Sequence, residues 1–269
     1  MKTSGLLFSI FYLFTIIVAT AGSADDSLRE AVTSGNVSMA ETALMSGADI
    51  ELNQEGNTPL MLALAKGNGS MAEMLIKHGA KPNGITPLFI ATMKGDTEAL
   101  KTLVKSKKDL QALDEWSENA LHYAVRSKNL KVVLLLLQSG IKVNQKNQLG
   151  LTPLMVAVED GSQMLINTLI DHKADINAQD AYGQTAIFIA TARGNLEAVA
   201  TLISRRANVN VLDKEENSAL SIALANHEGY ATRDDQESKV KAITYASIVK
   251  SLRKAGAIES GELSVANSP

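Results

Sequence analysis

The residues best suited to catalysis in this sequence are four histidines, and the partners that catalysis needs are missing around them. A histidine acts as a general base or metal ligand only with a nucleophile or further ligands at a defined spacing. The sequence has no cysteine, no nucleotide-binding P-loop, no His-Glu-x-x-His zinc motif and no Gly-x-Ser-x-Gly nucleophile elbow. The four residues are His78, His122, His172 and His227. We assign them structural roles and predict that the chain is not an enzyme.

Two acidic clusters are the other candidates for chemistry. Glu159 and Asp160 are adjacent in the sequence, so their carboxylates do not face one another across a cleft. Asp234, Asp235 and Glu237 lack the glycine and the ligand spacing of a calcium-binding loop. We expect both clusters to be solvated surface, and we predict no metal and no cofactor.

Composition narrows the class of partner. The chain has 269 residues and a net charge of −3, so it lacks the basic footprint of a nucleic-acid-binding protein. Without cysteine it forms no disulfides, which is compatible with an oxidising compartment but does not establish one. We therefore predict no nucleic-acid partner.

Residues 1–24 have the pattern of a signal peptide. Lys2 carries the only charge, and an apolar run of 13 residues extends from Leu6 to Val18. This length is typical of the apolar core of a signal peptide and is short for a membrane span. We predict cleavage after Ala24, with Ala21 as the second candidate and an uncleaved anchor as the alternative. After cleavage we expect no stable membrane insertion, with Asp25 and Asp26 at the N-cap of the first helix.

The rest of the chain repeats itself with a period of 33 residues. Thr152 is followed by Thr185 and preceded by Asn119 at this spacing, and Leu169 corresponds in the same way to Leu202 and Leu136. Each copy opens with a cap residue, which proline follows in three cases, and then has leucine or isoleucine with an alanine three residues later. These features predict a helix with an N-cap, a stripe of leucine and isoleucine, and a close neighbour at the alanine. The blocks are Thr58–Ala63, Thr86–Ala91, Asn119–Ala124, Thr152–Ala157, Thr185–Ala190 and Ser218–Ala223.

This period and the Thr-Pro-Leu-x-x-Ala motif resemble the ankyrin repeat. The resemblance implies an all-α solenoid of about seven helix-turn-helix units with short β-turn fingers, over residues 25–258. Such repeats are binding scaffolds, so the resemblance is specific for fold and nearly silent on the partner. The units are 25–55 as N-terminal cap, 56–83, 84–116, 117–149, 150–182, 183–215, and 216–258 as C-terminal cap, followed by a flexible tail at 259–269.

Three departures from the period mark local differences. Thr58 and Thr86 are only 28 residues apart, which predicts a gap in the finger row that is either a binding notch or a tolerated deletion. Gly69 is expected to delay the following helix slightly. An insertion at about 228–239 predicts a loop or longer helix ends in the last unit. Beyond it we expect five apolar residues to face inward, namely Val240, Ile243, Ile248, Val249 and Leu252.

The finger tips are the candidate partner site. The family implies that partners bind along the concave side, through the finger tips and the exposed ends of the first helices. Trp116, Leu149 and Tyr182 occupy successive tips 33 residues apart, and aromatic residues are enriched at interface hot spots. The alternative for Trp116 is that it folds back onto Leu113 or a neighbouring finger. The predicted partner-binding residues are Trp116, Leu149, Tyr182, Met93, Arg126, Glu159, Asp160 and Arg193.

We therefore predict a non-catalytic, exported, monomeric module that docks on a partner protein and inhibits or shields it. Two glycosylation sequons begin at helix caps, at Asn36 and Asn68, which favours a bacterial periplasm over a eukaryotic lumen. The sequence looks like periplasmic ankyrin proteins that act as immunity partners of peptidoglycan hydrolases or endopeptidases. The alternatives are a supporting partner of a periplasmic enzyme such as a catalase, a secreted effector that binds host proteins, and a scaffold held by an uncleaved anchor.

Overall fold

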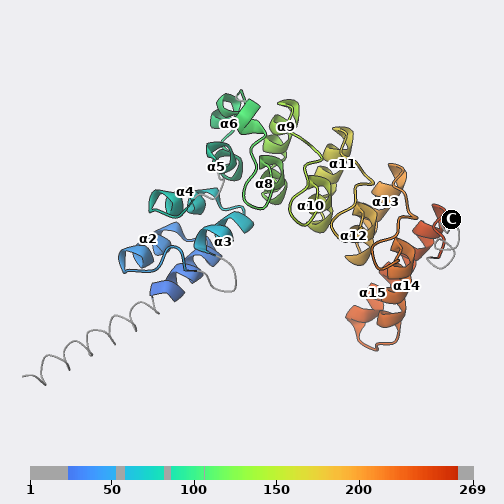
Figure 1. Ribbon diagram of the computed structural model, residues 1–269. Coiled ribbons are helices and arrows are strands. Elements are labelled where there is room, and N and C mark those ends of the chain that lie inside the picture. Colours follow the sequence, from blue (N-terminus) through green and yellow to red (C-terminus); the bar gives the residue numbers. More distant parts are fainter. Residues whose placement is uncertain (1–23, 53–57, 82–85, 106, 260–269) are drawn as a thin grey trace, which may run out of the picture. The chain divides into compact units, whose positions relative to one another are not determined.

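Paired antiparallel helices and short turns make up the chain in a computed structural model (Figure 1) that describes residues 24–52, 58–81, 86–105 and 107–259. Over these ranges the structure contains helices and turns and no strand. The signal-peptide prediction, the tail at 260–269 and the shortened finger at 82–85 lie outside them. The chain divides into an N-terminal part, Met1–Leu103, and a C-terminal part, Val104–Pro269. The all-α repeat prediction is confirmed.

The N-terminal part begins with a helix over residues 24–34. Asp25 and Asp26 lie within this helix and not at its cap, and the Asp25 carboxylate accepts a hydrogen bond from the backbone N–H of Asp49 (2.7 Å). Asn36 and Asn68 cap the helices that follow them, accepting from Met39 N (3.1 Å) and Met71 N (3.0 Å). The further helices of this part are α2 (Val37–Met45), α3 (Pro59–Ala65), α4 (Gly69–Lys77), α5 (Pro87–Lys94) and α6 (Thr97–Leu103).

The C-terminal part stacks its repeats through two rows of helices. The first helices of successive repeats, α8, α10, α12 and α14, pack one on the next. The second helices, α9, α11, α13 and α15, form the other row (Figure 1). The bounds are α7 (Lys107–Leu110), α8 (Ala120–Arg126), α9 (Leu130–Gln138), α10 (Pro153–Glu159), α11 (Gln163–Asp171), α12 (Ala186–Ala192), α13 (Leu196–Ser204), α14 (Ala219–Ala231) and α15 (Gln236–Lys254).

The repeat motif explains how each first helix begins and what it buries. Thr58 and Thr152 cap their helices as predicted, through bonds from Met61 N (3.3 Å) and Met155 N (3.4 Å). Thr86 and Thr185 make no side-chain cap bond, so threonine alone does not guarantee the cap. The motif leucine or isoleucine and the alanine three residues later are buried in every copy; these pairs start at Leu60, Leu88, Leu121, Leu154, Ile187 and Leu220.

Glycine has a different role at each of two positions in the helix pairs. Gly161 lies in the turn between α10 and α11. Its φ is +67°, in the left-handed region that glycine adopts without strain. Lys128 holds the same position one repeat earlier with φ +53°. Gly69 does not delay the helix, because α4 begins at Gly69 itself. A Cβ there would lie 2.7 Å from the Cβ of Met93, so Gly69 permits α5 to approach α4.

The insertion in the last repeat lengthens its helices, which was one of the two predicted outcomes. α14 runs to Ala231 and α15 starts at Gln236, with Asp235 as N-cap accepting from Ser238 N (2.8 Å). Val240 and Ile243 were predicted to face inward, and this was wrong: they are 54% and 68% exposed.

Two polar contacts fix the rotation of α15. The Tyr245 hydroxyl donates to the Ala192 carbonyl (2.8 Å), and the Ala242 carbonyl lies 2.9 Å from the His227 ring nitrogen Nδ1. The buried stripe therefore follows Ala242 and Tyr245 and continues through the predicted Ile248, Val249 and Leu252. Within the described ranges, no helix combines the length and apolar character that a membrane crossing needs.

Candidate partner-binding groove

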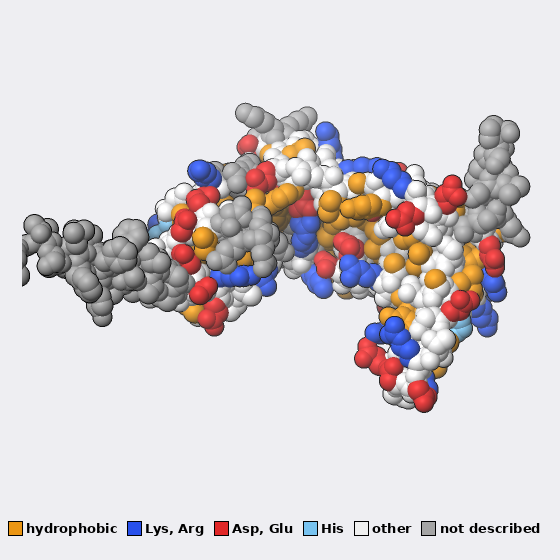
Figure 2. Space-filling view, turned by 60° about the horizontal axis from the view of Figure 1, so that its bottom comes forward, with side chains coloured by type: hydrophobic (Ala, Val, Ile, Leu, Met, Phe, Trp, Pro, Cys, Tyr) orange, Lys and Arg blue, Asp and Glu red, His pale blue; other side chains and the backbone are white. Residues whose placement is uncertain are grey.

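Backbone hydrogen bonds join the successive finger tips of the C-terminal part. Each tip carbonyl accepts an N–H from the next finger, so the predicted row of tips is brought together. Leu149 and Tyr182 are 54% and 59% exposed, whereas Trp116 is half-buried. Apolar side chains gather on one face of this part (Figure 2). The three bonds run from Gln148 N to Trp116 O (2.8 Å), Ala181 N to Leu149 O (2.9 Å) and Lys214 N to Tyr182 O (2.9 Å).

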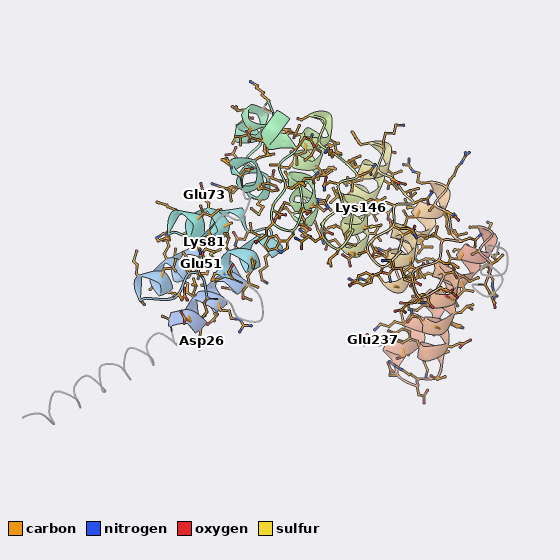
Figure 3. The ribbon with its side chains drawn as sticks, in the orientation of Figure 1. Asp26, Glu51, Glu73, Lys81, Lys146 and Glu237 are labelled. Atoms are coloured by element: carbon orange, nitrogen blue, oxygen red, sulfur yellow. The ribbon has the colours of Figure 1, made fainter. Side chains whose placement is uncertain are left out.

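An acidic or amide side chain at the base of each finger fixes the tip. Asp180 Oδ1 accepts the N–H groups of Tyr182 and Gln184, both at 2.8 Å. Asn147 and Asp114 make the same pair of bonds one and two repeats earlier, respectively. The recurrence of Asp114, Asn147 and Asp180 every 33 residues is the sequence signal for these base residues, which the tip positions alone do not reveal. The tips are therefore preorganised, and Lys146 adds a bond from its ammonium to the Gln179 carbonyl of the next finger (2.6 Å; Figure 3).

The space between the first two tips is filled by the chain itself; we call it the filled compartment. The Glu118 side chain is 5% exposed, and its carboxylate accepts both terminal N–H groups of Arg126. Asn147 donates to the same carboxylate (2.9 Å), and the Arg126 guanidinium lies over the Tyr123 ring, 5.9 Å from its centre. Arg126 was predicted to contact a partner. The structure instead commits both terminal groups of its guanidinium to Glu118.

Burial and pairing set the protonation of the filled compartment. Burial alone would raise the pKa of Glu118, but the hydrogen bonds and charge of Arg126 outweigh it, so that pKa is lowered. Burial raises the pKa of Asp114, which accepts the Tyr123 hydroxyl (2.5 Å), and it also raises the pKa of Tyr123. Burial lowers the pKa of His122, against the opposing charge of Glu118. The charges of Glu118 and Arg126 compensate one another, and the hydrogen bonds around Glu118 hold the finger in place.

The space between the next two tips is open; we call it the hollow compartment. It is a pocket of about 300 Å³ between the tips Leu149 and Tyr182. Glu159 and Arg193 form an ion pair at it (2.9 Å), with side chains 35% and 60% exposed. Four predicted site residues therefore meet here. The remaining lining comes from Leu151, Asp180, Gln184, Ile189 and Ala192.

The other predicted site residues lie elsewhere. Asp160 is exposed at the end of α10, where its carbonyl accepts the Lys128 ammonium (3.4 Å). Met93 was predicted as a surface contact, and this was wrong, because it is only 7% exposed. The physical reason is the close approach at Gly69, which places Met93 against α4.

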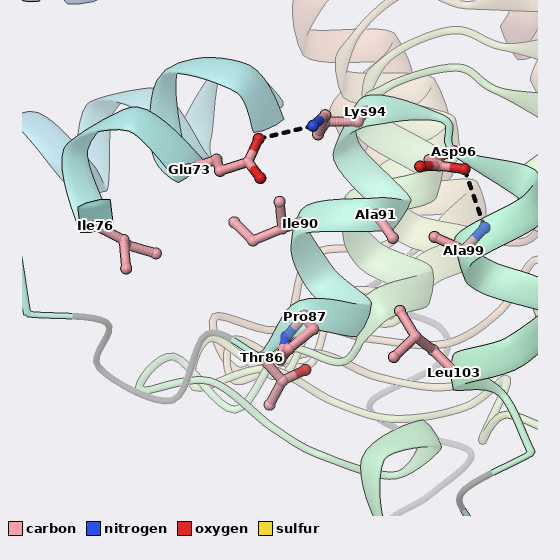
Figure 4. Close-up of a pocket in the computed structure, with 10 residues that line it drawn as sticks. All are labelled: Glu73, Ile76, Thr86, Pro87, Ile90, Ala91, Lys94, Asp96, Ala99 and Leu103. Carbon is pink, nitrogen blue, oxygen red and sulfur yellow. Dashed lines mark hydrogen bonds and ion pairs between the residues drawn. The ribbon is translucent and has the colours of Figure 1, made fainter.

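A second hollow lies in the N-terminal part, between residues of α4, α5 and α6. It has a volume of about 360 Å³ and is lined mainly by apolar residues such as Ile76, Ile90 and Leu103 (Figure 4). Glu73 and Lys94 form an ion pair at it (2.7 Å). The predicted notch itself falls on residues 82–85, outside the described ranges.

The described part of the chain holds no group of three or more histidine or acidic residues that could bind a metal ion. The buried titratable groups are instead paired with one another at the finger bases. The arrangement offers an apolar groove with one ion pair, which suits recognition of a polypeptide surface.

Comparison with known proteins places the repeats in a family. The sequence matches the family described as Ankyrin repeats (3 copies) over residues 28–114, 81–147, 106–180 and 154–233. The putative ankyrin repeat protein YahD of Escherichia coli is 30% identical over 154 residues, covering 53% of this chain and 77% of that protein. The ankyrin repeat domain of Bcl-3 superposes with a TM-score of 0.53 at 25% identity, covering 84% of this chain and 97% of that domain.

Other relatives are much longer than the matched segment. The mitochondrial disaggregase of Bos taurus is 31% identical over 155 residues, 54% of this chain and 23% of that protein. Alpha-latrocrustotoxin-Lt1a of Latrodectus tredecimguttatus is 29% identical over 157 residues, 56% of this chain and 11% of that protein. The chain thus spans a quarter or less of these two proteins, so the likeness extends to the repeats and not to their whole activities.

Proposed function

This chain belongs to the ankyrin-repeat family, and we propose that it is a protein-binding module whose partner docks in the groove of the C-terminal part, over the tips Leu149 and Tyr182. The observation that carries the proposal is the hollow compartment: an apolar pocket flanked by two large side chains that the chain leaves exposed. Exposed apolar groups that gather around a hollow are the usual mark of a partner site. The finger-base bonds support rapid docking, since the tips need little reordering.

We propose further that docking inhibits or shields the partner. A preorganised groove that covers a partner's surface acts by occupying it. The signal-peptide pattern in residues 1–24 supports export to the bacterial periplasm, and the resemblance to periplasmic ankyrin immunity proteins makes a peptidoglycan hydrolase or endopeptidase the proposed partner.

Site-specific photo-crosslinking in the native cells tests the docking face. A photoreactive amino acid replaces Leu149 in one variant and Met164 in the other. Met164 is a matched control because it is 63% exposed on α11, away from the finger tips. We expect one dominant crosslinked protein from position 149 and none from position 164. Equal yields at both positions, or a product only at 164, would place the partner elsewhere.

A hydrolysis assay tests the proposed action. Purified peptidoglycan is digested by a periplasmic extract with no addition, with the wild-type protein, or with a Leu149→Glu variant. We expect the wild-type protein to slow digestion and the variant to have little effect. Unchanged digestion would sink the inhibitor proposal, and faster digestion would identify a supporting partner instead. Cell fractionation with an antibody to the protein distinguishes a periplasmic protein from a secreted effector.

A further inference from the structure

We infer that the hollow compartment is an anchor pocket for one large, uncharged apolar side chain of the partner polypeptide. This inference rests on the proposed function and adds the chemistry of the group that is recognised. It is carried by a comparison of equivalent positions in the two compartments, by the polarity of the lining and by the charges at the rim.

The two compartments differ because three side chains are exchanged one repeat apart. Glu118, Tyr123 and Arg126 fill the first compartment. The residues at the equivalent positions of the second are Leu151, Val156 and Glu159. Arg126 lies inside its own compartment, whereas Glu159 turns to Arg193 on the next helix and leaves the space empty. In one compartment the chain supplies the occupant side chain, and in the other a partner must supply it.

The lining selects the chemistry of that occupant. Leu151, Ile189 and Ala192 give the pocket an apolar wall between the two apolar tips. Asp180 also lines it, but its Oδ1 already accepts two backbone N–H groups of its own finger. An apolar occupant therefore leaves these finger-base bonds undisturbed and contacts the apolar wall, whereas a polar occupant placed against that wall would lose its own water without gaining a new partner there.

The charges at the rim disfavour an ionic occupant. Glu159 and Arg193 neutralise one another at 2.9 Å. An acidic side chain entering the pocket would meet Glu159 and Asp180, and a basic one would meet Arg193, so a charged occupant of either sign would lie beside a like charge. An uncharged side chain covers the pair from solvent and strengthens it. The volume of about 300 Å³ suits a single side chain carried on a larger ligand.

Selection from a peptide library tests the inference without knowledge of the partner. A phage-displayed library of random dodecapeptides is panned on the wild-type protein alone, and the affinity of each selected peptide is then measured for an Ala192→Trp variant, whose indole fills the pocket. Ala192 is exposed at the end of α12, so the substitution leaves the core unchanged. The matched control is Ala225→Trp, at the equivalent exposed position one repeat later.

The expected peptides share a leucine, isoleucine, methionine or phenylalanine. They should bind Ala192→Trp at least tenfold more weakly than the wild type and should bind Ala225→Trp unchanged. Replacing the shared residue by serine in the peptide should weaken binding to a similar degree. Selection of peptides with a shared charged residue in its place would overturn the inference, as would a library that yields no binder sensitive to Ala192→Trp.

A Leu149→Glu variant separates failure of this inference from failure of the proposed function. Peptides that are insensitive to Ala192→Trp but lose binding to Leu149→Glu would refute the anchor pocket and leave the groove as the docking face. Peptides that are insensitive to both variants would refute the pocket and count against the groove as well.

Discussion

Two successive repeats, residues 117–149 and 150–182, share one backbone plan and differ in what they place inside it. The first holds a buried ion pair, a buried histidine and two non-glycine residues with positive φ. The second has Leu151, Glu159 and Met155 in place of the pair and the histidine, glycines at the two turns, and an open pocket. The comparison teaches that the fold tolerates a polar interior when its charged groups are paired, and the proposed recognition site lies where the next repeat leaves this space open.

The largest expected effect comes from breaking the buried pair. Arg126→Ala leaves the Glu118 carboxylate, 5% exposed, without its cation, and we expect a loss of about 3 to 5 kcal/mol in unfolding free energy. Glu159→Ala removes the equivalent residue of the second repeat, whose pair with Arg193 is solvent-exposed, and should cost less than about 1 kcal/mol. Urea unfolding of the two variants measures both values, and similar losses would contradict the contrast.

The next largest change in stability is expected from exchanging glycine and serine at the turns of two successive fingers. Gly150 has φ +77°, and a Cβ there would lie 2.4 Å from the backbone nitrogen of Ala181 in the next finger. Gly150→Ser should therefore destabilise by about 2 to 3 kcal/mol, from φ strain together with overlap. Ser117 adopts φ +61° at the equivalent turn, so Ser117→Gly should be neutral or slightly stabilising. Thermal unfolding of both variants tests this, and a harmless Gly150→Ser would mean that the fingers are not in contact.

A smaller change in stability is expected from the same kind of exchange in the turns between the two helices of a repeat. Lys128 has φ +53° where the next repeat has Gly161 at φ +67°. Lys128→Gly should stabilise by about 1 kcal/mol, and Gly161→Lys should destabilise by about as much, because a Cβ at Gly161 meets only ordinary contacts. Circular dichroism melts of the two variants should move in opposite directions.

The smallest expected effect is a pH dependence of the unfolding free energy that comes from His122, in the repeat formed by residues 117–149. Burial lowers the folded-state pKa of His122, so the stability associated with its neutral form is present above the unfolded pKa and is lost as pH falls. We expect the wild type to lose up to about 1 kcal/mol more than His122→Met between pH 7.5 and 5.5. Met155 is the equivalent residue of the second repeat. Urea unfolding at the two pH values measures this, and equal slopes would show that His122 is not buried in its neutral form.

The sequence predicts the repeat plan because its period is repeated many times over. The 33-residue spacing placed the helix pairs, the left-handed turns and the neighbouring tips before any contact was known. It could not predict contacts made by a single copy. Gly69 looked like a spacer because its contact is with Met93, on a helix that follows the shortened finger. The rotation of α15 depends on the bond from Tyr245 to Ala192, which lies outside the inserted residues.

The candidate site was predictable to the extent that it follows the period. Leu149, Tyr182, Glu159 and Arg193 were selected by their place in the repeat, and they meet at one pocket. The period gave no reason to expect that Arg126 would be bound by Glu118, because the acid is absent from the equivalent positions Leu151 and Gln184. A compartment is filled when two interacting side chains, such as Glu118 and Arg126, occur together. The residue at one position therefore does not predict whether the compartment is filled or hollow.

The bonds that the tip residues Trp116, Leu149 and Tyr182 make to the next finger use main-chain atoms, as from Gln148 N to Trp116 O. The identity of a tip side chain is thus absent from the interactions that hold the fingers in register. Mutations at these positions can accumulate in a lineage with little selection against them for folding. Under the proposed function, a few substitutions at the tips would therefore direct the protein to a new partner while its scaffold is inherited unchanged.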